Sequence, residues 1–312
     1  MYQCHGWDGR APEAPGGLDD ALAVPLRATP TAAPDWRELL ADLPRAIEQG
    51  EIVPFYQPVI DLRGVALAGF ECLARWRHPR RGWIGPDRFI PLAIQSGTID
   101  AMSAALLCQA CHDMKSWSDR HTLSFNLAPQ QLLGPFPDAC LAILRRAGID
   151  PERLILEVTE ESAITELGAT RAAVERLRRA GVAFALDDFG KGMANLHRLR
   201  ELRFDRIKID RELIAHGGEG GVGEVTRAVI VLAQTLDQAI TAEGVETAAQ
   251  VAELAALGCT HAQGFYFSAA VPAELAAKLA RRPQSMVDRI RRATIEFQRT
   301  PGTAPLRPAE TA

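Results

Sequence analysis

The sequence predicts an α/β fold of the (β/α)8 TIM-type barrel class, and three observations lead to this prediction. Two strand-like segments follow one another near the start, and helical and strand-like segments alternate thereafter. About eight strands fit into roughly 230 residues, which is the size and rhythm of such a barrel. The run 183–186 is apolar throughout, as in a parallel strand that is covered on both faces.

Each element has its own sequence pattern. Asp35 is expected to cap a first helix that runs to about Gln49, and Gly50 is its natural end. The expected strands are 53–62, 65–76, 122–127, 154–158, 182–186, 206–209, 239–242 and 262–267. The expected helices are 87–96, 102–116, 138–147, 167–180, 193–202, 225–236 and 248–257, and further helical segments lie within 273–299.

The two ends of the chain differ in composition from the middle. Residues 1–35 are rich in Pro, Ala and Gly, and prolines recur from Pro301 onward. Both stretches are typical of disorder. We therefore expect a disordered leader over 1–35, a folded domain over 36–283, and a C-terminal helix with a disordered tail over 284–312.

The totals exclude several classes of function. The chain is 47% hydrophobic and 24% charged, as in ordinary globular proteins, and its formal net charge of -4 provides no general attraction to nucleic-acid polymers or anionic membranes. The N-terminus lacks the pattern of an export signal, and the six cysteines are scattered rather than framed for disulfides. We expect a cytoplasmic protein with neither a nucleic-acid polymer nor a membrane as partner.

One short pattern has two interpretations. The segment from Cys108 to His112 reads Cys-Gln-Ala-Cys-His and matches the signature of covalent haem attachment. It lies inside a helical pattern, however, and haem attachment normally requires export. We interpret the segment as a buried helix face.

Polar side chains collect where the predicted strands end, and a parallel barrel places its catalytic groups there. They are Glu71, Asn126, Glu157 with Glu160, Asp187 with Asp188, Lys208 with Asp210, Glu243 with Glu246, and Gln263. Asp187 and Asp188 alone are also compatible with capping of the next helix. So many carboxylates on one rim repel one another, however, unless cations neutralise them.

This set of side chains indicates the chemistry. Carboxylates and one Asn, without His or Cys, are hard oxygen ligands for Mg²⁺ or Mn²⁺, and there are enough for two ions. Two such ions bind the attacking and leaving oxygens of a phosphoester and acidify a bridging water. Lys208 adds a positive charge that orients this water or stabilises the charge on phosphorus, and Arg75 is placed to bind a phosphate oxygen. The sequence predicts metal-assisted phosphodiester hydrolysis.

Seven of these segments occur together in order within 39–272: Glu71-Cys72-Leu73-Ala74-Arg75-Trp76, Phe125-Asn126-Leu127-Ala128-Pro129, Glu157-Val158-Thr159-Glu160, Asp187-Asp188-Phe189-Gly190, Lys208-Ile209-Asp210, Ala242-Glu243-Gly244-Val245-Glu246-Thr247 and Gln263-Gly264-Phe265. Together they resemble the EAL-domain cyclic di-GMP phosphodiesterases, here as a stand-alone EAL domain. The resemblance implies a barrel whose first strand is antiparallel to the others. It also implies hydrolysis of cyclic di-GMP to linear pGpG with Mg²⁺ or Mn²⁺.

The resemblance also implies roles for single residues. Glu71, Asn126, Glu157 and Asp187 would hold one cation, and Asp187 would bridge to a second cation that Asp188 also binds. Glu243 is similar to the family's metal-associated catalytic glutamate, and Lys208 to the lysine near the attacking water. Glu160 corresponds to a residue that stabilises the loop after the fifth strand. Gln263 and Glu246 would line the same pocket as Arg75.

Two positions depart from the family pattern. Cys72 replaces the middle Ala of the signature, and we expect this exchange to be silent because the side chain points away from the metals. The loop 190–195 differs more, because the family usually has Thr, then Gly, Tyr and two Ser. Lys191 in this loop either repels the second cation or contacts substrate phosphate, and the sequence does not decide between them.

The altered loop leaves an alternative function open. In family members this loop couples metal binding to dimer contacts, so we expect a homodimer. The alternative is a non-catalytic cyclic di-GMP receptor, or a protein-interaction regulator, that keeps the pocket without turnover. An unrelated metal-dependent barrel is a third interpretation. Control is expected from a protein partner, from dimerisation or from the two ends of the chain.

Overall fold

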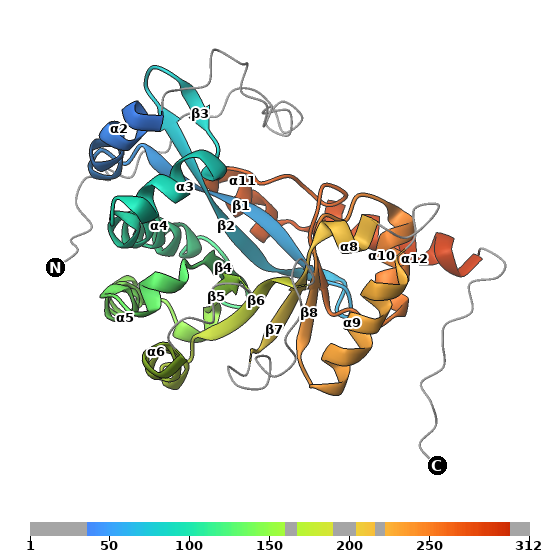
Figure 1. The fold of residues 1–312 in the computed structure, drawn as a ribbon. Coiled ribbons are helices and arrows are strands. Elements are labelled where there is room, and N and C mark those ends of the chain that lie inside the picture. The colour runs from blue at the N-terminus through green and yellow to red at the C-terminus, as the bar shows by residue number, and fades with distance from the viewer. Residues whose placement is uncertain (1–35, 160–166, 190–203, 216–221, 300–312) are drawn as a thin grey trace. The chain divides into compact units, whose positions relative to one another are not determined.

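A computed structural model describes residues 36–159, 167–189, 204–215 and 222–299 (Figure 1). The chain divides into two compact units. Unit 1 comprises Met1–Gln57, Phe70–Ala183 and Ala270–Arg281, and unit 2 comprises Pro58–Gly69, Phe184–Ala269 and Arg282–Ala312. The predictions for the leader, the tail, Glu160, the helix 193–202 and the loop 190–195 lie outside the described residues.

Unit 1 contains the N-terminal helices and the first strands of the chain. Its helices are α2 (Trp36–Glu48), α3 (Pro86–Gln95), α4 (Ile99–Met114), α5 (Phe136–Ala147), α6 (Leu167–Arg179) and α11 (Ala273–Arg281), with 3-10 turns at Pro129–Leu132 and Pro151–Arg153. Its strands are β3 (Gly82–Ile84), β4 (Thr122–Asn126), β5 (Leu154–Thr159) and parts of β1 (Ile52–Asp61) and β2 (Ala66–His78). Within this unit the strand order is β5-β4-β2-β3, and β4 and β5 are parallel.

Local sequence explains these elements, as α5 illustrates. Phe136, Cys140, Ile143 and Leu144 are spaced along one face of the helix and are buried. The helix ends at Gly148, whose φ of 70° is left-handed and therefore suits glycine. The short strand β3 was not predicted, because three residues are too few to show a period.

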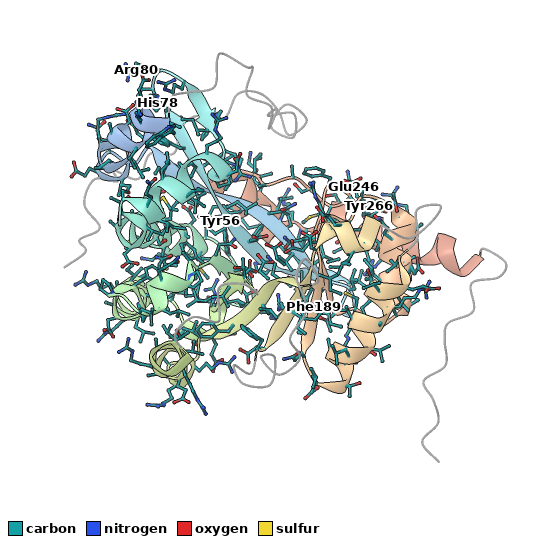
Figure 2. The ribbon with its side chains drawn as sticks, viewed as in Figure 1. Tyr56, His78, Arg80, Phe189, Glu246 and Tyr266 are labelled. Carbon is teal, nitrogen blue, oxygen red and sulfur yellow. The ribbon has the colours of Figure 1, made fainter. Side chains whose placement is uncertain are left out.

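The helix α2 is attached to the end of β2 by a small polar network. His78 Nε2 lies 3.0 Å from Asp42 Oδ2, and the Arg80 backbone N–H donates to His78 Nδ1 (Figure 2). The hydrogen bond from His78 lowers the pKa of the Asp42 carboxyl. Because Nδ1 already accepts a hydrogen bond, Nε2 of a neutral His78 donates to Asp42.

Unit 2 contains the remaining elements. They are β6 (Ala183–Phe189), β7 (Arg206–Ile209), α8 (Arg211–Ala215), α9 (Glu224–Thr235), β8 (Ala239–Ala242), α10 (Ala248–Ala256), β9 (His261–Ala262) and α12 (Gln284–Arg299). Its strand order is β1-β9-β8-β7-β6, and the neighbours from β6 to β9 are parallel. Ile60 of β1 pairs antiparallel with Ala262 of β9, which confirms the expected orientation of the first strand.

Most predicted elements are confirmed within two or three residues, and the largest difference is at 262–267. Only His261 and Ala262 form a strand there. The backbone turns at Gly264, where φ is 154°, and Tyr266 N–H donates to Val245 O instead of to a neighbouring strand. The apolar residues 265–267 therefore belong to a loop.

The cysteine predictions are only partly confirmed. Cys72, Cys111, Cys140 and Cys259 are free and buried, whereas Cys108 is disulfide-bonded, so the expectation of no disulfide is wrong for that residue. Cys111 lies within α4, and burial raises the pKa of its thiol to about 12, in agreement with a buried helix face. Among the described helices, none has both the length and the apolar character of a membrane span.

Candidate functional site

Three of the predicted site residues lie together in unit 1, and we call Glu71, Asn126 and Glu157 the unit 1 cluster. Asn126 ends β4 and lies opposite Glu157 in the parallel β4–β5 register. Its side-chain Nδ2 donates to Glu71 Oε1 at 2.9 Å. Glu71 is 5% exposed and Glu157 is 2% exposed. Buried carboxylates need hydrogen-bond donors or cations around them, so this cluster has the character of a binding site.

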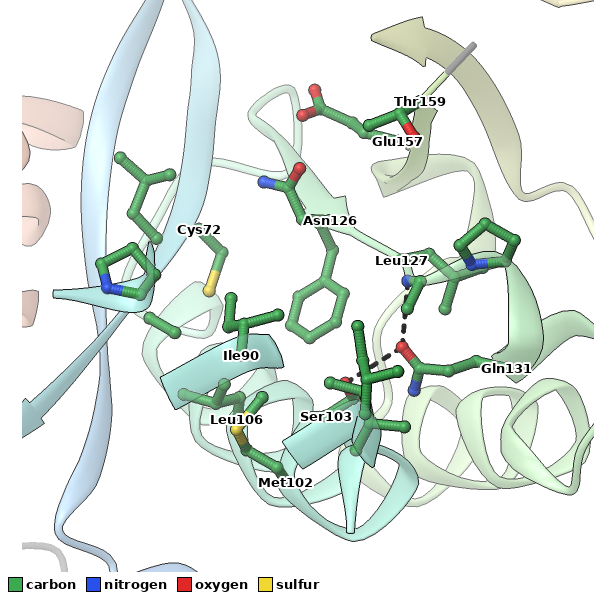
Figure 3. Close-up of a pocket in the computed structure, with 18 of the residues that line it drawn as sticks. Cys72, Ile90, Met102, Ser103, Leu106, Asn126, Leu127, Gln131, Glu157 and Thr159 are labelled. Atoms are coloured by element: carbon green, nitrogen blue, oxygen red, sulfur yellow. Dashed lines mark hydrogen bonds between the residues drawn. The ribbon is translucent and has the colours of Figure 1, made fainter. Parts of the chain in front are cut away.

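A pocket of about 440 Å³ adjoins the unit 1 cluster (Figure 3). The cluster and Thr159 line it with polar atoms, and Ile90 of α3 with Met102 and Leu106 of α4 line it with apolar atoms. Cys72, the neighbour of Glu71 on β2, also lines this pocket. Burial and the neighbouring Glu71 raise the pKa of the Cys72 thiol, which is therefore neutral near pH 7.

Arg75 lies above an aromatic pair in unit 1. Its Cζ is 5.9 Å from the ring centroid of Phe55. The ring centroids of Phe55 and Trp83 are 5.3 Å apart, and the two rings are arranged edge to face. Burial lowers the pKa of Arg75, and the charge of Glu71 opposes this change. The guanidinium remains charged, and Phe55 restricts its orientation. Phe55 and Trp83 were not predicted, because no local pattern links Phe55 of β1 to Arg75 of β2.

A second group lies in unit 2, and we call Asp187, Lys208, Glu243 and Gln263 the unit 2 cluster. Lys208 Nζ is 3.2 Å from Asp187 Oδ1 and 2.6 Å from Glu243 Oε1. Gln263 Nε2 donates to Glu243 Oε1 at 3.5 Å. Lys208 is only 1% exposed, so its ammonium depends on these carboxylates for stability.

Asp188 has an unusual backbone conformation. Its φ is 57°, and its N–H donates to Asp187 Oδ1 at 2.9 Å. The β6–β7 register shifts between Leu186 and Phe189, which is a bulge at the two aspartates. Bulges redirect side chains and occur next to active sites. The local sequence permits the conformation because Asp tolerates left-handed φ better than most residues.

Two loops of unit 2 hold Glu243 and Gln263 in place. Val245 N–H donates to Gln263 O at 3.0 Å, and Tyr266 N–H donates to Val245 O at 2.9 Å. A Cβ atom on Gly264 would lie 2.2 Å from both the N and the O of Val245. The two loops therefore interlock through backbone atoms and leave no space for a side chain between them.

Gly264→Ala is expected to destabilise the protein by about 2–4 kcal/mol, because it adds a backbone clash to an unfavourable φ. The free energy of unfolding in urea measures this loss. Gly97→Ala is the matched control, since its φ is 71° but no atom lies within 4 Å of the new Cβ. It should cost about 1–2 kcal/mol. Equal losses for the two variants would contradict the backbone interlock.

Other predicted site residues have different surroundings. Glu246 is exposed and lies beside Thr247, which caps α10 with its side chain (Figure 2). Asp210 is buried, and its Oδ1 accepts from Glu212 N–H at the start of α8, so it has a capping role. Within the described residues, no three His, Cys, Asp or Glu side chains converge on a common point. The hard oxygen donors of the two clusters nevertheless have the chemistry that Mg²⁺ and Mn²⁺ prefer.

Comparisons with known proteins agree with the sequence motifs. The EAL domain family matches residues 40–270. "Bifunctional diguanylate cyclase/cyclic di-GMP phosphodiesterase MucR" of Pseudomonas aeruginosa is 37% identical over 245 residues, which are 76% of this chain and 36% of that protein. "Probable cyclic di-GMP phosphodiesterase PdeG" of Escherichia coli is 39% identical over 236 residues, 72% of this chain and 46% of that protein. The chain thus spans less than half the length of these relatives.

A solved structure supports the fold. "PaMucR Phosphodiesterase, c-di-GMP complex" is 36% identical to this chain, with a TM-score of 0.71. The match covers 76% of this chain and 99% of that chain. This likeness confirms the predicted (β/α)8 TIM-type barrel with a mixed sheet.

Proposed function

The chain belongs to the EAL-domain family, and from this premise we propose that it hydrolyses cyclic di-GMP to linear pGpG with the help of two divalent cations. The relatives named as cyclic di-GMP phosphodiesterases support the substrate. The observation that carries the proposal is the contact of buried Lys208 with Asp187 and Glu243. A buried ion pair adds little net stability, so structural support alone does not explain this lysine. Its position between two carboxylates is suited to the control of charge and protons at a phosphodiester.

The proposed roles follow the chemistry of each side chain. Glu71, Asn126, Glu157, Asp187 and Asp188 are the proposed ligands of two Mg²⁺ or Mn²⁺ ions. Bound ions of this kind acidify a water and neutralise phosphate charge. Lys208 holds the carboxylates of Asp187 and Glu243 at fixed distances, and Gln263 donates to Glu243. Water adds to one phosphorus, and the 3′ oxygen leaves with a proton, so the ring opens to pGpG.

We further propose roles for the other site residues, an assembly and a location for the protein. Arg75, Gln263 and Glu246 bind the substrate, and Glu160 stabilises a neighbouring loop. The protein forms a homodimer, has a regulatory protein partner and is located in the cytoplasm. The ring of Phe55 under Arg75 supports the role of that residue, because it restricts a charged guanidinium, a group that binds a phosphate or a base edge through paired donors.

The test is incubation of the purified protein with cyclic di-GMP and either Mg²⁺ or Mn²⁺, followed by chromatography of the products. We expect pGpG, its loss on treatment with a chelator, and its return when the metal is restored. No pGpG with any divalent metal would contradict the proposal. Tight nucleotide binding without hydrolysis would indicate the receptor alternative.

Phe55→Leu is expected to raise KM for cyclic di-GMP about three- to tenfold and to leave kcat within about twofold. The substitution removes the ring under Arg75, a contact of about 1 kcal/mol, and binding groups of this kind act on substrate and transition state alike. Initial rates over a range of substrate concentrations measure both constants. Phe55→Tyr keeps the ring and should retain the original KM. An unchanged KM in Phe55→Leu would remove the positioning role of the ring.

A further inference from the structure

The helix α12 lies outside the segment that matches the family, and it packs against α10 in unit 2. Met286, Val287 and Ile290 in its first half are buried, and Ile290 is only 1% exposed. We propose that α12 is part of the catalytic apparatus, with Arg289 as a positioning residue for the loop that carries Gln263. This inference rests on the proposed function, because it assigns the loop a role in turnover.

Arg289 contacts that loop directly. Its Nη1 donates to Tyr266 O at 2.9 Å and to Phe267 O at 3.4 Å. In return, the Tyr266 hydroxyl donates to Arg289 O at 3.2 Å. A charged donor on two carbonyls is stronger than a neutral one, and reciprocal bonds restrict both partners. Arg289 therefore joins α12 to the backbone of the loop and not only to a flexible side chain.

The loop transmits this contact to the unit 2 cluster. Tyr266 N–H binds Val245 O, and Val245 N–H binds Gln263 O. Gln263 Nε2 in turn reaches Glu243, which binds Lys208. Each step is a hydrogen bond or an ion pair within one unit. A displacement of the loop at Tyr266 is therefore expected to move Gln263 and the groups that Gln263 contacts.

The second support passes through α10. Thr247 and Gln250 form a capping box at its start, and Gln250 Oε1 also accepts from Glu246 N–H at 2.8 Å. The helix thus fixes the residues that follow Glu243, and α12 packs on this helix. The helix α12 thus supports one loop of the unit 2 cluster directly and the other through α10, beside which it lies (Figure 1).

A general basic surface does not explain these contacts. Arg291 is exposed and lies only two residues from Arg289, and Arg292 Nε donates to Asp288 O of its own helix. Arg289 alone among these three arginines donates to the loop 263–267. The chain therefore provides a matched control, Arg291→Ala, with the same change of charge on the same helix.

The test compares wild type, Arg289→Ala, Arg289→Lys and Arg291→Ala in the full chain. Arg289→Ala should lower kcat about tenfold, because small displacements of catalytic groups reduce rates strongly, and should change KM less than threefold. Arg289→Lys keeps one charged donor and should recover part of the loss. Arg291→Ala should behave as wild type. Amide hydrogen exchange of Val245 and Tyr266 should accelerate at least about tenfold in Arg289→Ala only.

The exchange measurement separates this inference from the proposed function. If wild type produces no pGpG but exchange accelerates in Arg289→Ala, the proposed function fails and the positioning contact stands. If wild type is active, and neither kcat nor exchange changes in Arg289→Ala, the inference is overturned. Equal losses of kcat in Arg289→Ala and Arg291→Ala would also overturn it, since charge alone would then explain the effect.

Discussion

Glu243→Gln should lower the turnover of cyclic di-GMP by about 10²–10³-fold while the dissociation constant of the nucleotide changes by less than about threefold. The amide has the shape of the carboxylate and still accepts a hydrogen bond from Lys208. It lacks the negative charge, however, and it is a far weaker base. The buried ammonium would then keep Asp187 as its charged partner in this cluster, so the fold should survive.

Product chromatography measures the turnover of this variant, and calorimetric titration measures its affinity. Glu224→Gln is the matched control, because it makes the same exchange at an exposed position of the same unit. The control should lose far less turnover than Glu243→Gln. Full activity in Glu243→Gln would contradict the catalytic role of the carboxylate, and an equal loss of binding would show that it acts on substrate affinity instead.

Glu71→Ala should reduce turnover by at least about 10²-fold, because loss of several kcal/mol of charge stabilisation has an effect of this size. The variant removes one hard oxygen donor and leaves Asn126 Nδ2 without its contact at Glu71. Asn126 is exposed, so water replaces this partner and the melting temperature should change little.

Activity measured over a range of Mn²⁺ concentrations tests this explanation. Loss of a ligand should shift half-maximal activation to a higher Mn²⁺ concentration, whereas loss of folding would not. Glu48→Ala removes an exposed carboxylate from α2 of the same unit and should leave the metal dependence unchanged. An unchanged Mn²⁺ dependence in Glu71→Ala would remove Glu71 from the proposed ligands.

The prediction of the candidate site depended on where strands end. Asn126 and Glu157 end neighbouring parallel strands, so their register brings them together as expected. Lys208 and Glu243 follow the same rule, because β7 and β8 are parallel neighbours. A one-dimensional pattern is sufficient for such residues, since the strand end and the alternation of side chains determine their place.

Other features depend on residues far apart in the sequence. The contact between Arg289 and Tyr266 joins a loop and a helix 23 residues apart, and no local pattern marks it. The bulge at Asp188 arises from the register between two strands, and β9 ends early because Gly264 lies against Val245. Sequence patterns describe one element at a time and therefore contain no information on such contacts.

The antiparallel first strand was implied only by the resemblance to the EAL-domain family. By itself, the sequence determined the barrel class and the identity of the acidic, amide and lysine side chains at the strand ends. Both follow from short hydrophobic periods and from motifs in fixed order, which can be recognised in a sequence without knowledge of packing. Tertiary structure alone decided that Lys208 binds Asp187 and Glu243, that Phe55 lies under Arg75, and that α12 supports the loop of Gln263. The physical reason is that hydrogen bonds and ion pairs act over a few ångströms in space, whatever the separation along the chain.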